Sequence, residues 1–232
     1  MQRSLECPDL VKKRAPVITI DGPAGAGKST VARRLADKLG LKFLDTGAMY
    51  RAFTWAALAR NIDLRDPDAI VRLIRDSHLD FERGRVMLDG WDITDEIRAE
   101  RVTKNAVHVA DPPTVREELV KLQREFGREG GLVTEGRDQG TVVFPDADFK
   151  FYLDAAIDVR AKRRVEELQK RGEPATLQEI STGIADRDER DRRRKVGALK
   201  VPEGAIRIDT SDMTIDQVVS ELLSRVRTPE SA

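Results

Sequence analysis

The chain has 232 residues, which is enough for one α/β domain with a sizeable core and inserted subdomains. Lysine and arginine together number 41, as do aspartate and glutamate, so the formal net charge is zero. This balance argues against the overall basic field of a non-specific nucleic-acid binder, and we expect no nucleic-acid partner.

Residues 1–15 have the composition of a polar tail, which we expect to be disordered. They lack the apolar core of a secretory signal, although Lys12, Lys13 and Arg14 make them basic. The single cysteine, Cys7, has no partner for an internal disulfide. No run of about 18 apolar residues is present to span a membrane. We therefore expect a cytoplasmic protein without membrane contact.

A glycine-rich segment follows the first predicted strand, 17–20, and opens the first predicted helix, 29–39. Residues 22–29 have the pattern G-x-x-x-x-G-K-S. A strand, a glycine turn and a helix start together attract a polyphosphate through backbone N–H groups and the helix dipole. Lys28 is expected to reach the outer phosphates and the Ser29 hydroxyl to hold Mg²⁺. We infer that the chain binds a nucleoside triphosphate.

Short β-rich stretches alternate with longer amphipathic ones, which predicts an α/β fold with a parallel sheet covered by helices on both faces. The predicted core strands are 17–20, 42–44, 132–134, 149–153 and 205–208. The predicted helices are 29–39, 48–60, 67–76, 112–128, 159–171, 177–193 and 215–226.

Four of these helices carry start signals. Asp66 and Asp111 each precede a proline and are expected to cap the following helix. Thr176 with Glu179, and Thr214 with Gln217, fit the capping box.

Residues 79–93 interrupt the alternation with the pattern of a small antiparallel meander, which turns near Gly84 and at Asp89 and Gly90. Such an insert is either a substrate-side subdomain or a surface hairpin, and the sequence favours neither.

Two polar clusters directly follow predicted strands, at the edge where open α/β sheets bind ligands. In 45–51 (DTGAMYR), Thr46 lies at the strand end and Arg51 is placed to hold an incoming phosphate. In 135–140 (EGRDQG), Arg137 is suited to neutralise a transferring phosphoryl group and Asp138 to accept hydrogen bonds from a base. The structural alternatives are a helix cap with a surface arginine, and a buried ion pair.

A third cluster, 187–195 (RDERDRRRK), is dense in charge. As a helix it places Arg187, Arg190, Asp191 and Arg194 on one face, which permits a clamp of guanidinium groups around phosphates. A solvated face with i,i+4 ion pairs is the alternative.

Together these segments closely resemble the bacterial cytidylate kinases, a family of P-loop nucleoside monophosphate kinases. The similarity covers about 17–226 and rests on 20–30 (IDGPAGAGKST), 44–51 (LDTGAMYR), 136–145 (GRDQGTVVFP), the charged residues of 187–194, and 208–210 (IDT). It implies a three-layer P-loop NTPase fold with a five-stranded parallel sheet over 16–232. It also implies a monophosphate-binding part over about 46–110 that contains the meander, and a lid over about 166–196.

The resemblance implies that ATP, with Mg²⁺ bound at Ser29, phosphorylates CMP and dCMP. The phosphate acceptor is already anionic, so the reaction needs charge neutralisation and alignment rather than a base. The residues that would hold ATP are Gly22, Pro23, Ala24, Gly25, Ala26, Gly27, Lys28, Ser29 and Thr30.

The resemblance also implies the acceptor site. Thr46, Arg116, Asp138 and Arg194 would surround the cytosine, Arg51 and Arg137 would bind the acceptor phosphate, and Arg187 and Asp191 would meet the sugar. The groups with a catalytic role would be Lys28, Arg51, Arg137 and Arg194.

Three positions depart from many members of the family: Val107, Gln139 and Ala198. They leave open how strictly the site discriminates against uracil. The alternatives are a kinase for UMP or dTMP on the same fold, and a P-loop regulatory switch, although the guanine-reading motif Asn-Lys-x-Asp is missing. We expect a monomer, because nothing in the sequence demands an interface.

Overall fold

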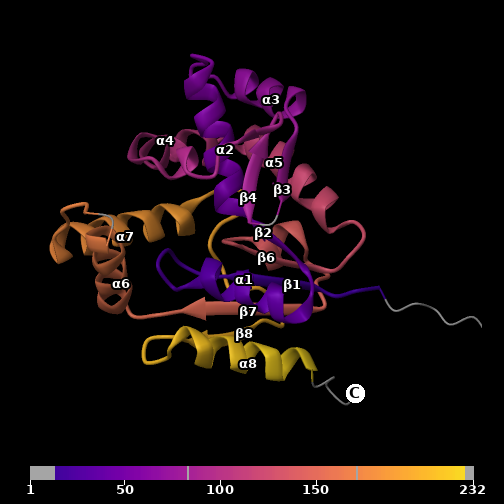
Figure 1. Cartoon of the computed structure of the whole chain (residues 1–232), viewed down its shortest axis with the longest axis vertical. Helices are drawn as coiled ribbons and strands as arrows, with labels where there is room; N and C mark the ends of the chain where they lie inside the picture. Colours follow the sequence, from indigo (N-terminus) through magenta and orange to yellow (C-terminus); the bar gives the residue numbers. More distant parts are fainter. Residues whose placement is uncertain (1–13, 83, 171, 228–232) are drawn as a thin grey trace, which may run out of the picture.

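The computed structural model describes residues 14–82, 84–170 and 172–227, so the expectations for residues 1–13, including Cys7, lie outside it (Figure 1). Five parallel strands form the central sheet in the order β2–β6–β1–β7–β8. They are β1 (Val17–Asp21), β2 (Lys42–Asp45), β6 (Leu132–Gly136), β7 (Phe149–Asp154) and β8 (Ile206–Asp209). All five predicted core strands are confirmed.

Helices pack on both faces of this sheet, as the α/β prediction requires. Helices α1 (Lys28–Leu39) and α8 (Ile215–Arg227) share one core with the sheet, and α2 (Thr46–Ala59) and α5 (Pro113–Gly127) contribute to the other. The neighbouring strand residues Leu132 and Val133 belong to different cores, because successive side chains of a strand point to opposite faces. The fold therefore has three layers.

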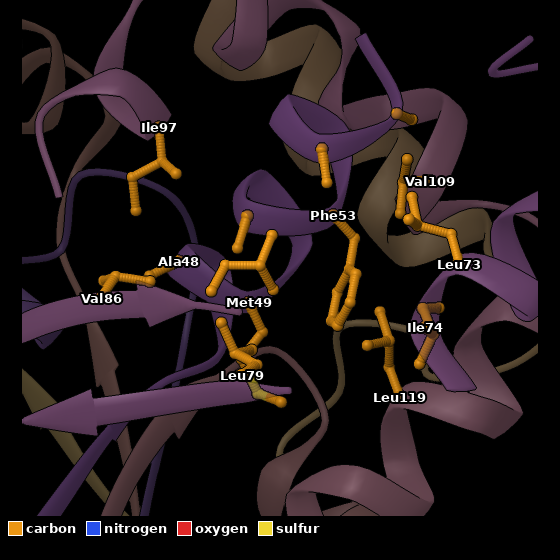
Figure 2. Packing of buried hydrophobic residues seen from close by; sticks show 14 of the residues in the cluster. Ala48, Met49, Phe53, Leu73, Ile74, Leu79, Val86, Ile97, Val109 and Leu119 are labelled. Carbon is orange, nitrogen blue, oxygen red and sulfur yellow. The ribbon is translucent and has the colours of Figure 1, made fainter. Parts of the chain in front are cut away.

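The second core extends away from the sheet around α2, where Phe53 and Met49 are fully buried (Figure 2). It includes α3 (Pro67–Asp76) and a small antiparallel sheet of β3 (Leu79–Glu82), β4 (Arg85–Leu88) and β5 (Trp91–Asp92). The predicted meander is thus present. Val86 and Leu88 are buried in this core, so the insert packs against α2 rather than standing off as a loose hairpin.

Two further helices, α6 (Ile157–Lys170) and α7 (Leu177–Arg193), pack on one another at one side of the molecule (Figure 1). The lid expected at about 166–196 corresponds to the end of α6 and to α7, and its motion remains a prediction. None of the helices within the described ranges combines the length and hydrophobicity needed to cross a membrane.

The start signals are confirmed at three helices and wrong at one. Asp66 caps α3, and the reciprocal bonds of Thr176 with Glu179 and of Thr214 with Gln217 are formed. Asp111 does not cap α5, which begins at Pro113 without a side-chain cap. Its carboxylate instead accepts a hydrogen bond from Arg194, so a long-range ion pair has replaced the local cap.

Three elements were not predicted: the short 3₁₀-helix Glu96–Arg98, α4 (Glu100–Ala110) and a π-helical turn, Gln139–Val143. Helix α4 has no side-chain cap, and only Val102 and Val109 are buried on it, so its start and its apolar stripe are weak signals. The π-helical turn begins within the polar cluster 135–140, for which we had predicted functional side chains but no helical turn.

Candidate active site

The phosphate loop has the backbone that its motif requires. Gly22, Gly25 and Gly27 all have positive φ values. A side chain at Gly22 would overlap the backbone carbonyl of Leu153, so only glycine fits there. The loop connects β1 directly to α1, and its backbone N–H groups lie at the start of that helix.

Lys28 is buried under this loop, and its Nζ donates a hydrogen bond to the carbonyl of Pro23 at 2.8 Å. Burial, and next the positive charge of Arg137, lower the pKa of Lys28 to about 7. Arg137 belongs to the predicted acceptor side, so its influence shows that the two predicted halves of the site meet at Lys28.

The Ser29 hydroxyl donates a hydrogen bond to the carboxylate of Glu135 at 2.7 Å. Glu135 is buried, and burial followed by the nearby charge of Asp45 raises its pKa. A hydroxyl and one carboxylate are hard oxygen ligands of the kind that Mg²⁺ uses beside phosphates and water. The described residues contain no cluster of three or more potential metal ligands, so this pair fits a metal held mainly by the nucleotide.

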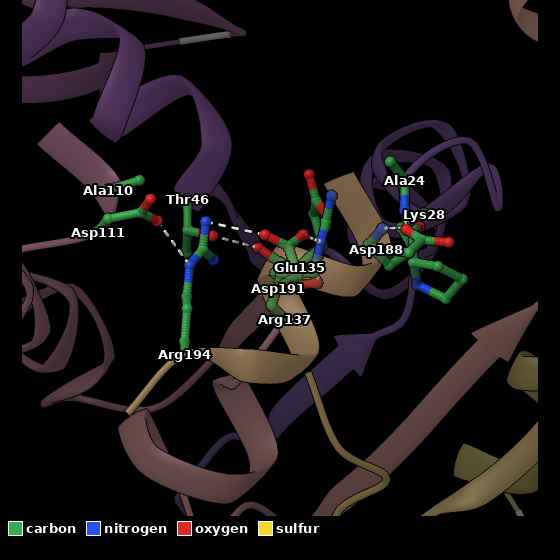
Figure 3. A network of polar contacts seen from close by, with 12 residues as sticks. Ala24, Lys28, Thr46, Ala110, Asp111, Glu135, Arg137, Asp188, Asp191 and Arg194 are labelled. Atoms are coloured by element: carbon green, nitrogen blue, oxygen red, sulfur yellow. Dashed lines mark hydrogen bonds and ion pairs between the residues drawn. The ribbon is translucent and has the colours of Figure 1, made fainter. Parts of the chain in front are cut away.

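Two arginines of the predicted acceptor site, Arg137 and Arg194, are joined by one carboxylate (Figure 3). Asp191 accepts from Arg137 Nε at 2.8 Å through one oxygen and pairs with Arg194 at 2.8 Å through the other. Burial alone would raise the pKa of Asp191, but the charges of Arg137, Arg194 and Arg187 outweigh it and lower the pKa. Arg194 also donates to Asp111 at 3.0 Å.

Arg194 does not lie on α7, contrary to the helical spacing we had used. The helix ends at Arg193, and Arg194 is its C-cap with extended backbone angles. The chain turn lets its guanidinium reach Asp111 and Asp191 together. Of the four residues expected on one face, Asp191 and Arg194 pair with each other, whereas Arg190 is exposed, and the clamp around phosphates stays a prediction.

Arg51 and Arg187 are brought to the same region. Arg51 lies 3.6 Å from the Asp45 carboxylate, which also caps α2. Arg187 is exposed, and no ion pair or hydrogen bond joins it to the described residues. Crowding by protein and the charge of Arg137 lower its pKa to about 10. Like charges this close are stable only beside anions, so the cluster is suited to phosphate.

Arg116 and Asp138 form a buried ion pair through Arg116 Nη2 and Asp138 Oδ2. The Arg116 guanidinium also lies over the Tyr50 ring, and its Nε is buried without a hydrogen-bond partner. Gly197, with φ of 67°, covers the pair, and a side chain there would overlap both groups. Thr46 is buried at the start of α2 and donates its hydroxyl to the Glu135 carbonyl at 2.7 Å.

Three residues of the site were given no role from the sequence: Glu135, Arg160 and Asp188. Arg160 on α6 pairs with Asp188 on α7 at 2.6 Å, and both are buried. Arg160 also donates to the carbonyl of Ala24, whose N–H points at Asp188 at 3.4 Å. Only the order of strand ends could have indicated Glu135, and nothing local indicated the other two.

One departure from the family has a structural account. The Gln139 side chain accepts from Thr134 at 2.9 Å and donates to Gln123 at 3.0 Å. It is buried, and all its polar atoms face these partners, so it supports the base side from behind.

The sequence comparisons agree with this geometry. The family model described as cytidylate kinase matches residues 18–228. A cytidylate kinase of Caldanaerobacter subterraneus subsp. tengcongensis is 48% identical over 210 residues, which are 90% of this chain and 94% of that protein. A cytidylate kinase of Anoxybacillus flavithermus is 45% identical over 214 residues, with 90% and 95% covered.

Solved structures agree on the fold. A shikimate kinase from Acinetobacter baumannii in complex with shikimate matches with a TM-score of 0.50 and 16% identity, covering 94% of this chain and 96% of that one. At this identity the match supports the three-layer P-loop fold alone. With the family model and the two relatives, it follows that the chain belongs to the cytidylate kinase family.

Proposed function

We infer that this chain transfers the γ-phosphoryl group of ATP to CMP and dCMP, giving CDP or dCDP and ADP. The observation that carries this inference is the position of Arg137. Its guanidinium is close enough to Lys28 to lower the pKa of that lysine, and it shares Asp191 with Arg194. A phosphate donor at Lys28 and a phosphate acceptor at the arginines would therefore face each other.

The free hydrogen-bonding atoms of the base side favour cytosine. Thr46 donates its proton to the Glu135 carbonyl, so its oxygen can only accept hydrogen bonds from a base. The Asp138 carboxylate is also an acceptor, whereas the unpartnered Nε of Arg116 is a donor. Cytosine has an amino group and two acceptors on its pairing edge. Uracil would place a carbonyl where the site offers acceptors, and this mismatch should cost it affinity.

The chain's own residues supply charge and alignment. Lys28 and Arg137 are positioned to neutralise the phosphoryl group as it moves from donor to acceptor. Asp191 binds Arg137 and Arg194 in the free protein, and the acceptor phosphate would take over part of these contacts when it binds. A Mg²⁺ ion bound by the nucleotide and Ser29 would add positive charge on the donor phosphates. No side chain has to remove a proton, because the attacking oxygen belongs to a phosphate.

The experiment is a coupled ADP-release assay with MgATP and, separately, CMP, dCMP, UMP, dTMP and AMP. Turnover confined to CMP and dCMP supports the proposal. Comparable specificity constants for UMP or dTMP would move the acceptor to the alternative monophosphates. ATP binding without turnover on any acceptor would instead favour a regulatory P-loop protein. The cytoplasmic location, the monomeric state and the lack of a nucleic-acid partner stay predictions from the sequence.

A further inference from the structure

Asp21 is a buried carboxylate with no role in the chemistry described so far. It is the last residue of β1, immediately before the phosphate loop, and it has no exposed surface. A carboxylate removed from water is costly unless its oxygens accept good hydrogen bonds. Its partners should therefore show what it does.

Both oxygens of Asp21 bind the same short segment. Oδ1 accepts the Gln139 N–H at 2.8 Å and Oδ2 accepts the Gly140 N–H at 2.7 Å. These are the first two N–H groups of the π-helical turn, so the turn itself offers them no partner. Successive backbone N–H groups form a concave donor site for an anion, and here the anion is a side chain of another strand.

The segment held in this way directly follows Arg137 and Asp138. The side chain of Gln139 is fixed as well, by Thr134 and Gln123. The backbone after Asp138 is thus attached to β1 through Asp21, whereas the backbone before it belongs to β6.

We propose that Asp21 is a positioning residue of the phosphoryl transfer, which fixes Arg137 and Asp138 relative to the phosphate loop. The proposal rests on the acceptor site inferred above. Because Asp21 has no exposed surface, it would act without contact to either substrate. It acts by fixing the distance from Lys28, at the end of the phosphate loop, to the two acceptor-side groups Arg137 and Asp138.

The electrostatic surroundings of Asp21 agree with a carboxylate held by backbone N–H groups in a buried position. Burial raises its pKa to about 7, against the effect of its two N–H donors. The charged groups that face it are Asp138, which raises the pKa further, and Lys28, which lowers it. The carboxylate is thus held at a cost that its backbone contacts offset.

The test is the Asp21→Asn variant, with Asp154→Asn as the matched control. The amide keeps the shape but loses one acceptor and directs an N–H₂ group at a backbone N–H. Asp154 is the corresponding carboxylate at the end of β7. It accepts the N–H of Ala155 and pairs with the exposed Arg207 at 3.6 Å. Steady-state kinetics and the affinities for CMP and for a non-hydrolysable MgATP analogue are measured well below the unfolding temperature.

We expect Asp21→Asn to lower kcat and raise the KM for CMP by about tenfold or more each, with the affinity for the ATP analogue within about twofold. A merely structural role would lower the unfolding temperature without this split. If a folded Asp21→Asn enzyme has the kinetic constants of the wild type and of Asp154→Asn, the proposal is wrong. A wild-type enzyme that ignores CMP would overturn the proposed function instead.

A second measurement uses the wild-type protein, so it tests the proposal even if the Asp21→Asn variant does not fold. Amide hydrogen exchange is followed at Gln139 and Gly140. Bound to a buried carboxylate, these two amides should exchange at least about a hundredfold more slowly than those of the exposed loop residues Asp146 and Asp148. Equal exchange rates would overturn the proposal without any reference to activity.

Discussion

The Ser29 hydroxyl and the Glu135 carboxylate meet at 2.7 Å, although 106 positions separate them in the chain. The contact exists because β1 and β6 are parallel neighbours, so that their carboxyl ends lie at the same edge of the sheet. Glu135 lies at the end of β6, and the phosphate loop leads from the end of β1 to Ser29. Ser29 is the first-turn residue of α1, and Glu135 pairs in register with Ile20. The carboxylate is therefore placed to accept a hydrogen bond from a metal-bound water or from the Ser29 hydroxyl.

Replacing Glu135 by Gln should raise the Mg²⁺ concentration needed for half-maximal rate and lower kcat by about tenfold or more, because the neutral amide attracts the metal less. Initial rates over a Mg²⁺ titration at fixed ATP and CMP measure both. The control is Glu129→Gln, an exposed acid that pairs with Lys42. An unchanged Mg²⁺ dependence of Glu135→Gln would remove Glu135 from the metal site.

Lys28 should take up a proton when MgATP binds. Its pKa of about 7 leaves it mostly neutral at pH 8 in the free protein. Donor phosphates beside the amine favour its charged form and restore a higher pKa. Calorimetric titrations at pH 8 in buffers of different ionisation enthalpy should therefore show uptake of about one proton per bound nucleotide.

Lys28→Met is the control for that proton and a test of the catalytic role. The uptake should fall close to zero, and turnover should drop by orders of magnitude, because the transferred group loses its neutralising charge. Proton uptake that persists in Lys28→Met would place the titrating group elsewhere. A near-normal rate would exclude Lys28 from the transferred phosphate.

Asp138→Ala should weaken CMP binding while sparing ATP. The carboxylate pairs with Arg116 and is the acceptor proposed to recognise the cytosine amino group. Removing it also leaves the buried Arg116 guanidinium unpaired. Because the lost acceptor is the group that would favour a cytosine amino group over a uracil carbonyl, we expect the ratio of kcat/KM for CMP to that for UMP to fall by about a hundredfold. Asp146→Ala, at an exposed position of the same loop, is the control. An unchanged CMP affinity would remove Asp138 from the base side.

Local patterns explain how much of this fold could be predicted. The five core strands are short apolar runs, and α3 begins at a capping aspartate before a proline, so neighbouring residues alone indicate them. The phosphate loop is equally local, because its glycines, Lys28 and Ser29 are consecutive. These are the features that a sequence encodes within a few residues.

The partners of the charged groups could not be predicted in the same way. Asp111 has the pattern of a cap but binds Arg194, 83 positions away, and Asp21 binds amides 118 and 119 positions away. Which acid meets which base depends on strand order and on where a helix ends. Arg194 shows this, since the end of α7 at Arg193 redirects it away from the helix face on which we had placed it.

Asp21 should make the stability of the wild type depend on pH relative to Asp21→Asn. Its folded pKa of about 7 lies above the ordinary value of 3.8, so the folded state binds the proton more tightly than the unfolded state. The associated stability is present at low pH and is lost as the pH rises towards 7 and above. The asparagine does not titrate.

Urea unfolding at pH 5.5 and pH 8.5 measures this difference. From the pKa shift, the free energy of unfolding of the wild type minus that of Asp21→Asn should be larger at pH 5.5 by about 2 kcal/mol. Asp154→Asn gives the background change between the two pH values. A difference that does not vary with pH, or that grows towards pH 8.5, would show that Asp21 has no raised pKa.

The pair Arg160–Asp188 should be strongly coupled in a double-mutant cycle. It joins α6 to α7 at 2.6 Å with side chains only 5% and 2% exposed. It also binds Ala24 of the phosphate loop, whose carbonyl accepts from Arg160 and whose N–H donates to Asp188. Either single alanine variant leaves a buried charge without its partner and should cost about 3 kcal/mol of unfolding free energy. The double variant leaves none, so it should cost much less than the sum.

The exposed pair Arg34–Asp216 is the matched control, because it has the same 2.6 Å separation with side chains 48% and 84% exposed. Water screens this pair, so its coupling energy should stay below about 1 kcal/mol. Arg160→Ala, alone or together with Asp188→Ala, should also weaken MgATP binding, since the Ala24 carbonyl loses its donor. Arg34→Ala should not weaken it. Additive energies at Arg160 and Asp188, or unchanged nucleotide affinity, would mean that this pair does not hold the loop against α7.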